Sequence, residues 1–155
     1  MHVKDVMTRH VQVCTPDTNL GVAAMIMWKN DCGVVPVMND DTKVLGMITD
    51  RDICMAVATK HRLASDITVG DVFSGNLYAC NPQEDVREAL KLMRAGKVRR
   101  LPVISANGTL QGIISINDVV LHADDEVGVT RSELCYEDVV HTLKDICARR
   151  IRAAA

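Results

Sequence analysis

Hydrophobic residues in the first 60 positions change their spacing from one segment to the next, and the spacing predicts a series of short elements. An apolar run at 11–14 ends in a proline turn and predicts a strand. Apolar residues at helical spacing predict a helix over 20–27. Two β-branched runs at 33–38 and 44–48, joined by the polar turn NDDTK, predict a hairpin, and a second helix is expected over 50–58. The predicted order is strand, helix, strand, strand, helix.

The same series recurs further along, because a shift of 66 residues superimposes the first third of the chain on the second without a gap. Twelve of thirteen compared positions are identical, and the thirteenth pairs Val57 with Ala123. The identical pairs are Val3/Val69, Asp5/Asp71, Val6/Val72, Cys14/Cys80, Pro16/Pro82, Ala23/Ala89, Met27/Met93, Pro36/Pro102, Val37/Val103, Gly46/Gly112, Ile48/Ile114 and Asp52/Asp118. Many of these residues set turns and caps, so both copies are expected to follow one backbone path. The second copy predicts strands at 77–80, 98–104 and 110–114, and helices from Val86 to a stop at Gly96 and over 116–123.

The repeat divides the chain into four parts: repeat 1 at 1–59, a polar linker at 60–68, repeat 2 at 69–124 and a tail at 125–155. The tail predicts an amphipathic helix with Thr130 or Ser132 as its cap. Its apolar positions are Leu134, Val139, Leu143, Ile146 and Ile151. Amphipathicity does not identify the surface against which such a helix packs. Two readings therefore stay open, a cover for the chain's own core and a contact with a second copy or a partner.

Composition and charge narrow the class of protein. With 155 residues, 48% of them hydrophobic, the chain can bury a core without disulfides. A net charge of -2 argues against a nucleic-acid surface, and 3% aromatic residues argue against a stacking platform for single strands. Neither a signal-peptide apolar core nor an apolar run of about 18 residues is present, so we expect a cytoplasmic protein that makes no use of a membrane.

The six cysteines raise the alternatives of disulfides or a metal site. They are Cys14, Cys32, Cys54, Cys80, Cys135 and Cys147, and none stands in a CxxC pair. We interpret them as reduced, mostly buried small hydrophobes. Zinc would require ligands from isolated cysteines and from His2, His10, His61, His122 or His141, none of which has zinc-ligand spacing, so no metal site is predicted.

The segment GMITDRDI carries the most informative spacing. Thr49 and Asp52 are three residues apart at a predicted helix start, as in a capping box, where the hydroxyl and the carboxylate satisfy backbone N–H groups reciprocally. The second copy repeats the pair as Ser115 and Asp118. A helix N-terminus with a hydroxyl also suits a phosphate, and a carboxylate one turn on suits ribose hydroxyls. Duplication would copy a cap as readily as a binding site, so the spacing leaves both readings open.

These segments resemble a known family. GVVPV with GMITDRDI, and VRRLPV with GIISINDV, are similar to two tandem cystathionine β-synthase (CBS) motifs that form one Bateman module, over about residues 3–123. The resemblance implies an α/β (α+β) fold of two β-α-β-β-α repeats with pseudo-twofold symmetry, to which the C-terminal helix is added. It also implies ligand clefts between the repeats, a homodimer, and an adenosine-containing ligand. AMP, ADP and ATP lead that list, and S-adenosylmethionine and NAD rank below them.

The resemblance also assigns residues to the ligand. It makes Thr49 and Ser115 the phosphate-side hydroxyls and Asp52 and Asp118 the ribose-binding carboxylates. The expected adenine-lining residues are Val35, Pro36, Leu101 and Pro102, with Thr15 as a further candidate.

Three arginines are candidate phosphate partners, because a guanidinium group pairs a phosphate with two hydrogen bonds. Arg99 and Arg100 precede the second LPV strand, and Arg51 begins the first capped helix. A solvated helix face or strand end is the alternative for each. The repeats differ here, since Gly33 and Val34 replace the arginine pair and Asn117 replaces Arg51, which leaves open whether one cleft or both are occupied.

No nucleophile elbow, P-loop or HExxH helix is present, so we predict a protein without enzymatic activity. The leading hypothesis is a stand-alone regulatory module that senses an adenosine-type ligand and acts in trans on a protein partner that the sequence does not name. A ligand-free dimerisation or scaffold module, in which the Thr-x-x-Asp pairs are only helix caps, is the alternative. A metal or redox sensor that uses the cysteines ranks third.

Overall fold

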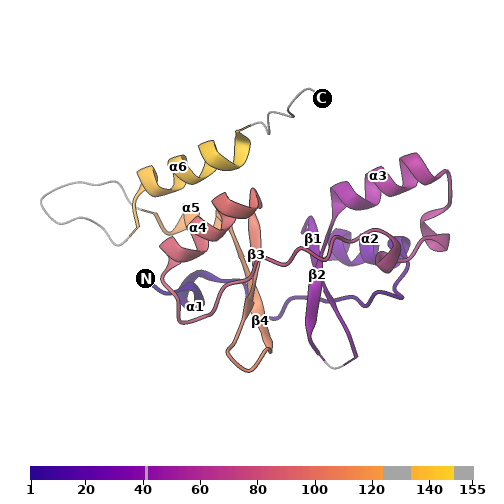
Figure 1. Cartoon of the computed structure of the whole chain (residues 1–155), viewed down its shortest axis with the longest axis horizontal. Coiled ribbons are helices and arrows are strands. Elements are labelled where there is room, and N and C mark those ends of the chain that lie inside the picture. The colour runs from indigo at the N-terminus through magenta and orange to yellow at the C-terminus, as the bar shows by residue number, and fades with distance from the viewer. Residues whose placement is uncertain (41, 124–133, 149–155) are drawn as a thin grey trace, which may run out of the picture. The chain divides into compact units, whose positions relative to one another are not determined.

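The computed structural model describes residues 1–40, 42–123 and 134–148 and forms two compact units (Figure 1). Unit 1 comprises Met1–Arg9, Tyr78–Ser105 and the described residues of Gln111–Ala155, and unit 2 comprises His10–Leu77 and Ala106–Leu110. The elements are α1 (Val3–Val6), α2 (Leu20–Lys29), β1 (Val34–Met38), β2 (Val44–Thr49), α3 (Asp50–Lys60), the 3-10 turns η1 (Ala64–Asp66) and η2 (Val69–Asp71), α4 (Val86–Gly96), β3 (Arg100–Ile104), β4 (Leu110–Ser115), α5 (Ile116–Leu121) and α6 (Tyr136–Cys147). The mixed helix-and-strand fold with two equivalent repeats confirms the predicted fold class.

Each unit contains one of the two predicted hairpins. In unit 2, β1 pairs antiparallel with β2, and the register sets Val34 against Thr49 and Val37 against Gly46. In unit 1, β3 and β4 form the second two-stranded sheet. Alternate residues of β2 are buried, as expected for a strand with one face on a core, whereas β1 is buried along nearly its whole length.

The predicted strands at 11–14 and 77–80 are wrong, because each is reduced to a single parallel bridge. Cys14 bridges Val37 through hydrogen bonds of 3.0 Å to Pro36 O and 2.8 Å from Met38 N. The next ladder bonds would require N–H groups on Pro36 and on Pro16, which proline lacks. Cys80, Pro82 and Pro102 repeat the arrangement in unit 1, so all four prolines of the chain stop a ladder at one bridge.

The predicted helices form, with small changes at their ends. Asn19 caps α2 and Asp85 caps α4, and each side-chain oxygen accepts from a backbone N–H of the first turn. Helix α4 ends at Gly96 as predicted, although Lys97 takes the left-handed conformation after it. Helix α3 continues to Lys60, beyond the predicted end, and α5 stops at Leu121, before it. None of the helices in the described part of the chain has the length and hydrophobicity needed to cross a bilayer.

The segments that lead each repeat pack on the body of the other repeat. Val3 lies in the core of unit 1, and its repeat equivalent Val69 lies in the core of unit 2. Four antiparallel bridges fix the leading segments, His2↔Asp85 and Thr8↔Ile113 in unit 1 and their equivalents Asn19↔Thr68 and Met47↔Ser74 in unit 2. Capping boxes at α1 and η2 close the two leading segments in the same way. Each unit is therefore assembled from equivalent parts of both repeats.

Gly46 and Gly112 allow this crossing. A Cβ added to Gly46 would lie 2.8 Å from the carbonyl oxygen of Ser74, and one added to Gly112 would overlap the backbone of Thr8. The leading segment thus passes against the hairpin where a side chain would obstruct it. This explains the repeated glycine of GMITD and GIISI.

The predicted tail helix is α6, and it covers the core of its own unit. Leu134 and Val139 belong to the core cluster of unit 1, and Leu143 and Ile146 pack against that cluster. The expected caps Thr130 and Ser132, and Ile151, lie outside the described residues. The N-cap is Cys135, so the predicted cap was wrong; Asp138, three residues on, still closes a capping box.

Candidate functional site

Thr49 and Asp52 form the reciprocal cap at the start of α3. The Thr49 backbone N–H donates to Asp52 Oδ2 at 2.9 Å, and the Thr49 hydroxyl donates to the same oxygen at 2.7 Å. In return, the Asp52 backbone N–H donates to Thr49 Oγ1 at 3.2 Å. Both residues are half-buried. The capping reading of the Thr-x-x-Asp spacing is therefore confirmed for the first repeat.

Ser115 and Asp118 reproduce this geometry at the start of α5. Asp118 Oδ2 accepts from the Ser115 backbone N–H and from its hydroxyl, each at 2.7 Å, and Ser115 Oγ accepts from the Asp118 N–H at 3.2 Å. The repeats thus carry the same cap with a different hydroxyl residue. They differ in the helix that follows, since α3 has 11 residues and α5 has 6, so the longer α3 has the larger dipole at its N-terminus.

The two caps use only one oxygen of each carboxylate. All donors to Asp52 and Asp118 meet Oδ2, and among the described residues no donor reaches Oδ1 of either side chain. A carboxylate oxygen has two acceptor positions, so each Asp keeps capacity for an external donor such as a hydroxyl group. Capping and ligand binding by the same carboxylate are therefore compatible.

The predicted adenine-lining residues lie on the strand next to each cap. Val34 pairs with Thr49, which places Val35 and Pro36 one and two residues along β1 from the cap. In unit 1, Leu101 and Pro102 hold the equivalent positions in β3. The side chains of all four are buried, so only their backbone groups are suited to reading a base edge.

The predicted arginines lie near the capped helix starts. Arg51 is in the first turn of α3. The Arg99 carbonyl accepts from the Ile116 N–H at 2.9 Å, which holds Arg99 beside the first turn of α5, and Arg100 begins β3. Among the described residues, none of these three guanidinium groups forms an ion pair or a hydrogen bond. All three therefore remain available to an anion.

Thr15 lies apart from the first cap. It follows Cys14, whose partner on β1 is Val37, whereas Thr49 faces Val34 on the other side of that strand. The register separates the two positions by about 10 Å along the strand. The Thr15 hydroxyl lies 3.2 Å from the hydroxyl of Thr18, and Thr18 Oγ1 also accepts from the Thr15 N–H.

Two equivalent cysteines are held as thiols. Cys14 and Cys80 are buried at repeat-related positions, as expected. Burial raises the pKa of Cys14 to about 11, and burial with the nearby charge of Glu84 raises the pKa of Cys80 to about 12. Thiols with such pKa values are poor nucleophiles and poor metal ligands at neutral pH. The described residues contain no group of three or more His, Cys, Asp or Glu side chains suited to a metal ion.

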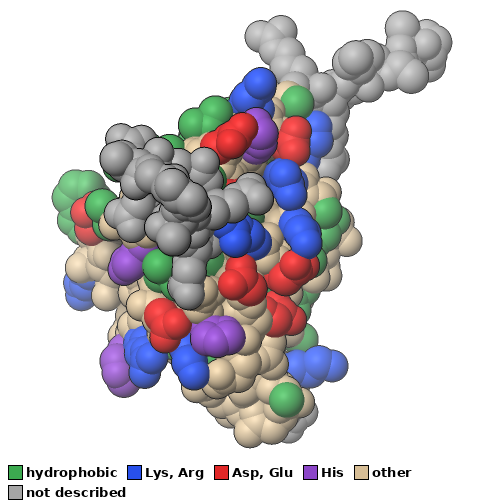
Figure 2. Space-filling model, turned by 90° about the vertical axis from the view of Figure 1, so that its left-hand side faces the viewer, with side chains coloured by type: hydrophobic (Ala, Val, Ile, Leu, Met, Phe, Trp, Pro, Cys, Tyr) green, Lys and Arg blue, Asp and Glu red, His purple; other side chains and the backbone are tan. Residues whose placement is uncertain are grey.

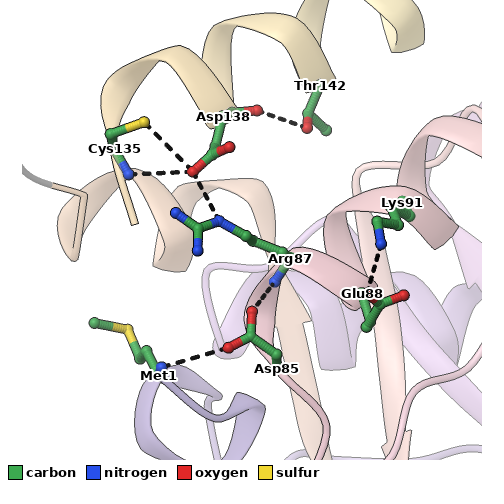
Figure 3. Close-up of polar contacts among 8 residues, drawn as sticks. All are labelled: Met1, Asp85, Arg87, Glu88, Lys91, Cys135, Asp138 and Thr142. Atoms are coloured by element: carbon green, nitrogen blue, oxygen red, sulfur yellow. Dashed lines mark hydrogen bonds and ion pairs between the residues drawn. The ribbon is translucent and has the colours of Figure 1, made fainter. Parts of the chain in front are cut away.

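A polar cluster in unit 1 was not predicted from the sequence (Figure 3). Arg87 Nε on α4 donates to Asp138 Oδ2 on α6 at 3.1 Å, and the same oxygen accepts from the Cys135 N–H and thiol at 3.4 Å. Burial opposes ionisation of Asp138, but the bonds from Cys135 and Arg87 outweigh it and lower the pKa of Asp138. The sequence signal was Cys135-x-x-Asp138, the spacing of the caps at Thr49 and Ser115 with a thiol in place of the hydroxyl.

Both repeats of the chain match known proteins. The model of the CBS domain family matches residues 3–59 and 69–125. The CBS domain-containing protein YhcV of Bacillus subtilis is 29% identical over 139 residues, which cover 88% of this chain and 97% of YhcV.

Two solved structures extend the comparison. Hypoxic Response Protein I with two coordinated zinc ions is 30% identical with a TM-score of 0.72, and the match covers 80% of this chain and 100% of that one. CBSX2 in complex with AMP is 26% identical with a TM-score of 0.66, over 78% of this chain and 94% of that one.

Proposed function

Because this chain belongs to the CBS domain family and carries two CBS domains in tandem, we propose that it is a regulatory module that senses an adenosine-containing ligand. The proposed ligand is AMP, ADP or ATP, ahead of S-adenosylmethionine and NAD. The module has no enzymatic activity in this proposal and acts in trans on a protein partner, as a cytoplasmic homodimer. We propose that the module consists of the predicted parts, namely repeat 1 at 1–59, a linker at 60–68, repeat 2 at 69–124 and a tail at 125–155.

One observation carries the proposal: the twice-repeated carboxylate that closes a helix cap with Oδ2 and, among the residues that the structure describes, receives no donor at Oδ1. A vicinal diol has two hydroxyl donors, and an ionised carboxylate oxygen is a strong acceptor for them. Asp52 and Asp118 are therefore proposed to bind the ribose of the ligand. That CBSX2, a similar protein, has been crystallised with AMP supports the choice of nucleotide.

The proposal assigns the phosphate to Arg51 in the first repeat and to Arg99 and Arg100 in the second. Their guanidinium groups have no protein partner among the described residues and can pair a phosphate with two hydrogen bonds. The hydroxyls of Thr49 and Ser115 already donate to the carboxylates. To donate to a phosphate, each must turn its proton away from Oδ2, so we assign them a secondary role.

The backbone groups of Val35 and Leu101, each followed by a proline, are proposed to read the adenine edge. Pro36 and Pro102 have no N–H, so neither can donate to the base. Thr15 remains a candidate whose contact with the same ligand is untested. The first repeat, with the longer helix behind its cap, is the stronger candidate site.

The test compares thermal unfolding of the full chain with and without AMP, ADP, ATP, NAD and S-adenosylmethionine. At 100 times its dissociation constant, a ligand adds about 2.7 kcal/mol to the free energy of unfolding. We expect one of the adenine nucleotides to raise the midpoint, and Asp52→Ala or Asp118→Ala to abolish the increment.

The chain offers a matched control for cap loss. Asp71 closes the same Thr-x-x-Asp box on Thr68, with a bond of 3.2 Å from the Thr68 N–H, and is not among the predicted ligand-binding residues. Asp71→Ala should lower the baseline midpoint and leave the ligand increment unchanged. If no ligand acts and all three substitutions only lower the baseline, the protein is the ligand-free scaffold of the alternative hypothesis.

A further inference from the structure

Helices α4 and α6 of unit 1 enclose a small cavity, the α4–α6 cavity, with a volume of about 100 Å³. Leu90 and Thr142 line it and are 2% and 1% exposed. Lys91 and His141 line it as well, and their side chains are 58% and 57% exposed. The cavity therefore has a buried floor and opens to solvent beside Lys91 and His141.

Three of the described side chains that line the cavity are permanently basic, and all three come from α4. They are Arg87, Lys91 and Arg94. Their spacing of four and three residues places them in a row along one face of the helix. The shift of 66 residues replaces them on α2 by Gly21, Met25 and Trp28. The row of cations is thus a property of the second repeat alone.

Acidic side chains of α6 meet this row at its two ends. At one end, Arg87 Nε donates to Asp138 Oδ2 at 3.1 Å, and at the other, Arg94 Nη1 lies 3.9 Å from Asp145 Oδ2. Lys91 lies in the middle, and its ion pair within the described residues is with Glu88 of its own helix, at 2.6 Å (Figure 3). The positive charge in the middle of the row is therefore not matched by a carboxylate of α6.

Several N–H donors at the cavity have no acceptor within the described part of the chain. A distance of 3.9 Å is too long for a hydrogen bond, so Arg94 makes none there with its guanidinium group. The Lys91 ammonium has three donors and gives one to Glu88. His141 Nε2 is 3.7 Å from Glu137, again too far, and an imidazole carries at least one N–H in either charge state. Donors from both helices thus line one cavity.

The size and surroundings of the cavity select a small anion. A volume of 100 Å³ corresponds to roughly three water molecules of about 30 Å³ each, enough for one tetrahedral oxyanion and too little for a nucleotide. Glu88 and Asp145 stand beside the cavity without lining it. Acidic and basic side chains also lie side by side on the face that Figure 2 shows. A large polyanion would meet such carboxylates, whereas a small anion inside the cavity meets the donors.

We propose that the α4–α6 cavity binds a tetrahedral oxyanion of the phosphate or sulfate type. Lys91 and Arg94 donate to it from α4 and His141 donates from α6, because guanidinium and ammonium groups form charge-assisted hydrogen bonds with such oxygens. The acidic lining residue Asp138 keeps its bond to Arg87. Since the anion contacts both helices, it fastens α6 to unit 1. The site shares no residue with the proposed nucleotide site and does not rest on it.

Calorimetric titration of the full chain with sodium phosphate tests the proposal, at an ionic strength held constant with sodium chloride. We expect saturable binding of one phosphate per chain. Lys91→Gln with Arg94→Gln should raise the dissociation constant about 100-fold, about tenfold for each charged donor. The matched control, Lys29→Gln with Lys60→Gln, removes the same charge from exposed residues of unit 2 and should leave the dissociation constant unchanged.

His141→Ala tests the contribution of α6 without changing α4. It should raise the dissociation constant by about 2–10-fold, as expected for the loss of one hydrogen bond. Because His141 is largely exposed, the variant should fold like the wild type. It therefore remains informative if the double variant does not fold.

Hydrogen exchange shows where the phosphate acts. Phosphate also stabilises proteins generally, because it is excluded from their surfaces. Bound phosphate should instead slow the exchange of α6 amides more than that of α2 amides, with the midpoint found by calorimetry. Glycerol phosphate distinguishes the source of the group. If it binds as tightly as inorganic phosphate, the cavity takes a phosphate ester as well, and if it does not bind, the cavity takes the free ion.

Three results would overturn the proposal: no saturable phosphate binding by the wild type, binding that both the double variant and His141→Ala leave unchanged, or an equal loss in the control variant. Asp52→Ala and Asp118→Ala should not alter phosphate binding. If they abolish it, the phosphate occupies the proposed nucleotide site and the α4–α6 cavity is not its site. A chain that binds phosphate in this way but responds to no nucleotide would contradict the proposed function alone.

Discussion

The two units are built from equivalent parts, yet the helices that follow the proline turns meet different surroundings. On α4, the outward positions are charged and lie beside α6, with which Arg87 and Arg94 form ion pairs. On α2, the equivalent positions are apolar or glycine, and the largest of them is in water. The comparison teaches that the two repeats share a backbone path and the buried face of the helix, whereas the residue types on the outer face of each helix differ with the element that covers it.

The helix caps show the opposite behaviour. The hydrogen bonds that join Thr49 to Asp52 and Ser115 to Asp118 agree within 0.2 Å. The bond from the backbone N–H to the carboxylate is 2.9 Å in the first cap and 2.7 Å in the second, and the other two bonds have identical lengths in both caps. The candidate ribose-binding carboxylates are therefore held by the same hydrogen bonds in both repeats. Four predictions test how far the likeness and the difference extend.

The largest effect is expected where α6 enters the core of unit 1. Leu134 is 2% exposed, so Leu134→Ala should lower the free energy of unfolding by about 2–5 kcal/mol through the lost contacts and the cavity. Urea unfolding measures it. Val140→Ala on the exposed side of α6 should change it by less than about 0.5 kcal/mol. Similar small losses in both variants would show that α6 is not part of this core.

The caps should contribute equally in the two repeats. Thr49→Ala and Ser115→Ala each remove a hydroxyl that accepts from a backbone N–H, and each should cost about 0.5–2 kcal/mol in urea unfolding. Thr59→Ala is the control, because its hydroxyl donates to the Met55 carbonyl within the same helix and caps no helix start. If Thr49→Ala or Ser115→Ala lowers the free energy of unfolding no more than Thr59→Ala does, the two caps do not stabilise their helices equally.

The ion pair that holds α6 should depend on pH. The folded-state pKa of Asp138 is below the ordinary value of 3.8, so its carboxylate stabilises the fold fully above about pH 5, and this stabilisation is lost as the pH falls through 3.8 toward the folded value. Arg87→Met should cost about 0.2–1 kcal/mol near neutral pH and less below pH 4. The difference in unfolding free energy between wild type and variant, measured across this range, tests the sign. A difference that grows in acid would contradict it.

The last prediction concerns reactivity and leaves stability unchanged. Cys32, Cys54 and Cys147 are exposed, whereas Cys14, Cys80 and Cys135 are buried. A thiol reagent at pH 8 should therefore modify three thiols per native chain quickly, and all six only after denaturation. Rapid modification of Cys14 but not Cys80, followed by peptide mapping, would show that the two bridges differ in solution.

The hairpins, the helices and the repeat could be predicted from the sequence because each depends on local spacing and on residues such as Pro36 and Gly46. The strands at 11–14 and 77–80 were overpredicted, because apolar runs do not reveal that Pro16 and Pro36 remove the donors of the next ladder bonds. The pairing of each leading segment with the other repeat could not be foreseen, since Val3 and Val69 are equally apolar whichever core they fill.

Only the local part of the candidate site could be predicted from the sequence. The Thr-x-x-Asp spacing gave the caps, because a capping box is local to four residues. That the Arg99 carbonyl accepts from the Ile116 N–H depends on a contact across the hairpin that periodicity does not contain. The Arg87–Asp138 pair joins residues 51 positions apart, beyond the reach of any local pattern.

The crossing of the leading segments makes each repeat incomplete alone. A peptide comprising one repeat would carry Val3 or Val69 but lack the core in which that residue is buried, and its only source of that core would be another molecule. Two such peptides would complete each other by exchanging leading segments, as in a domain-swapped dimer. In the present chain, the same exchange takes place between two repeats that are joined by a linker. Cutting that linker should yield two fragments that reassemble with each other, because each holds the segment that the other requires.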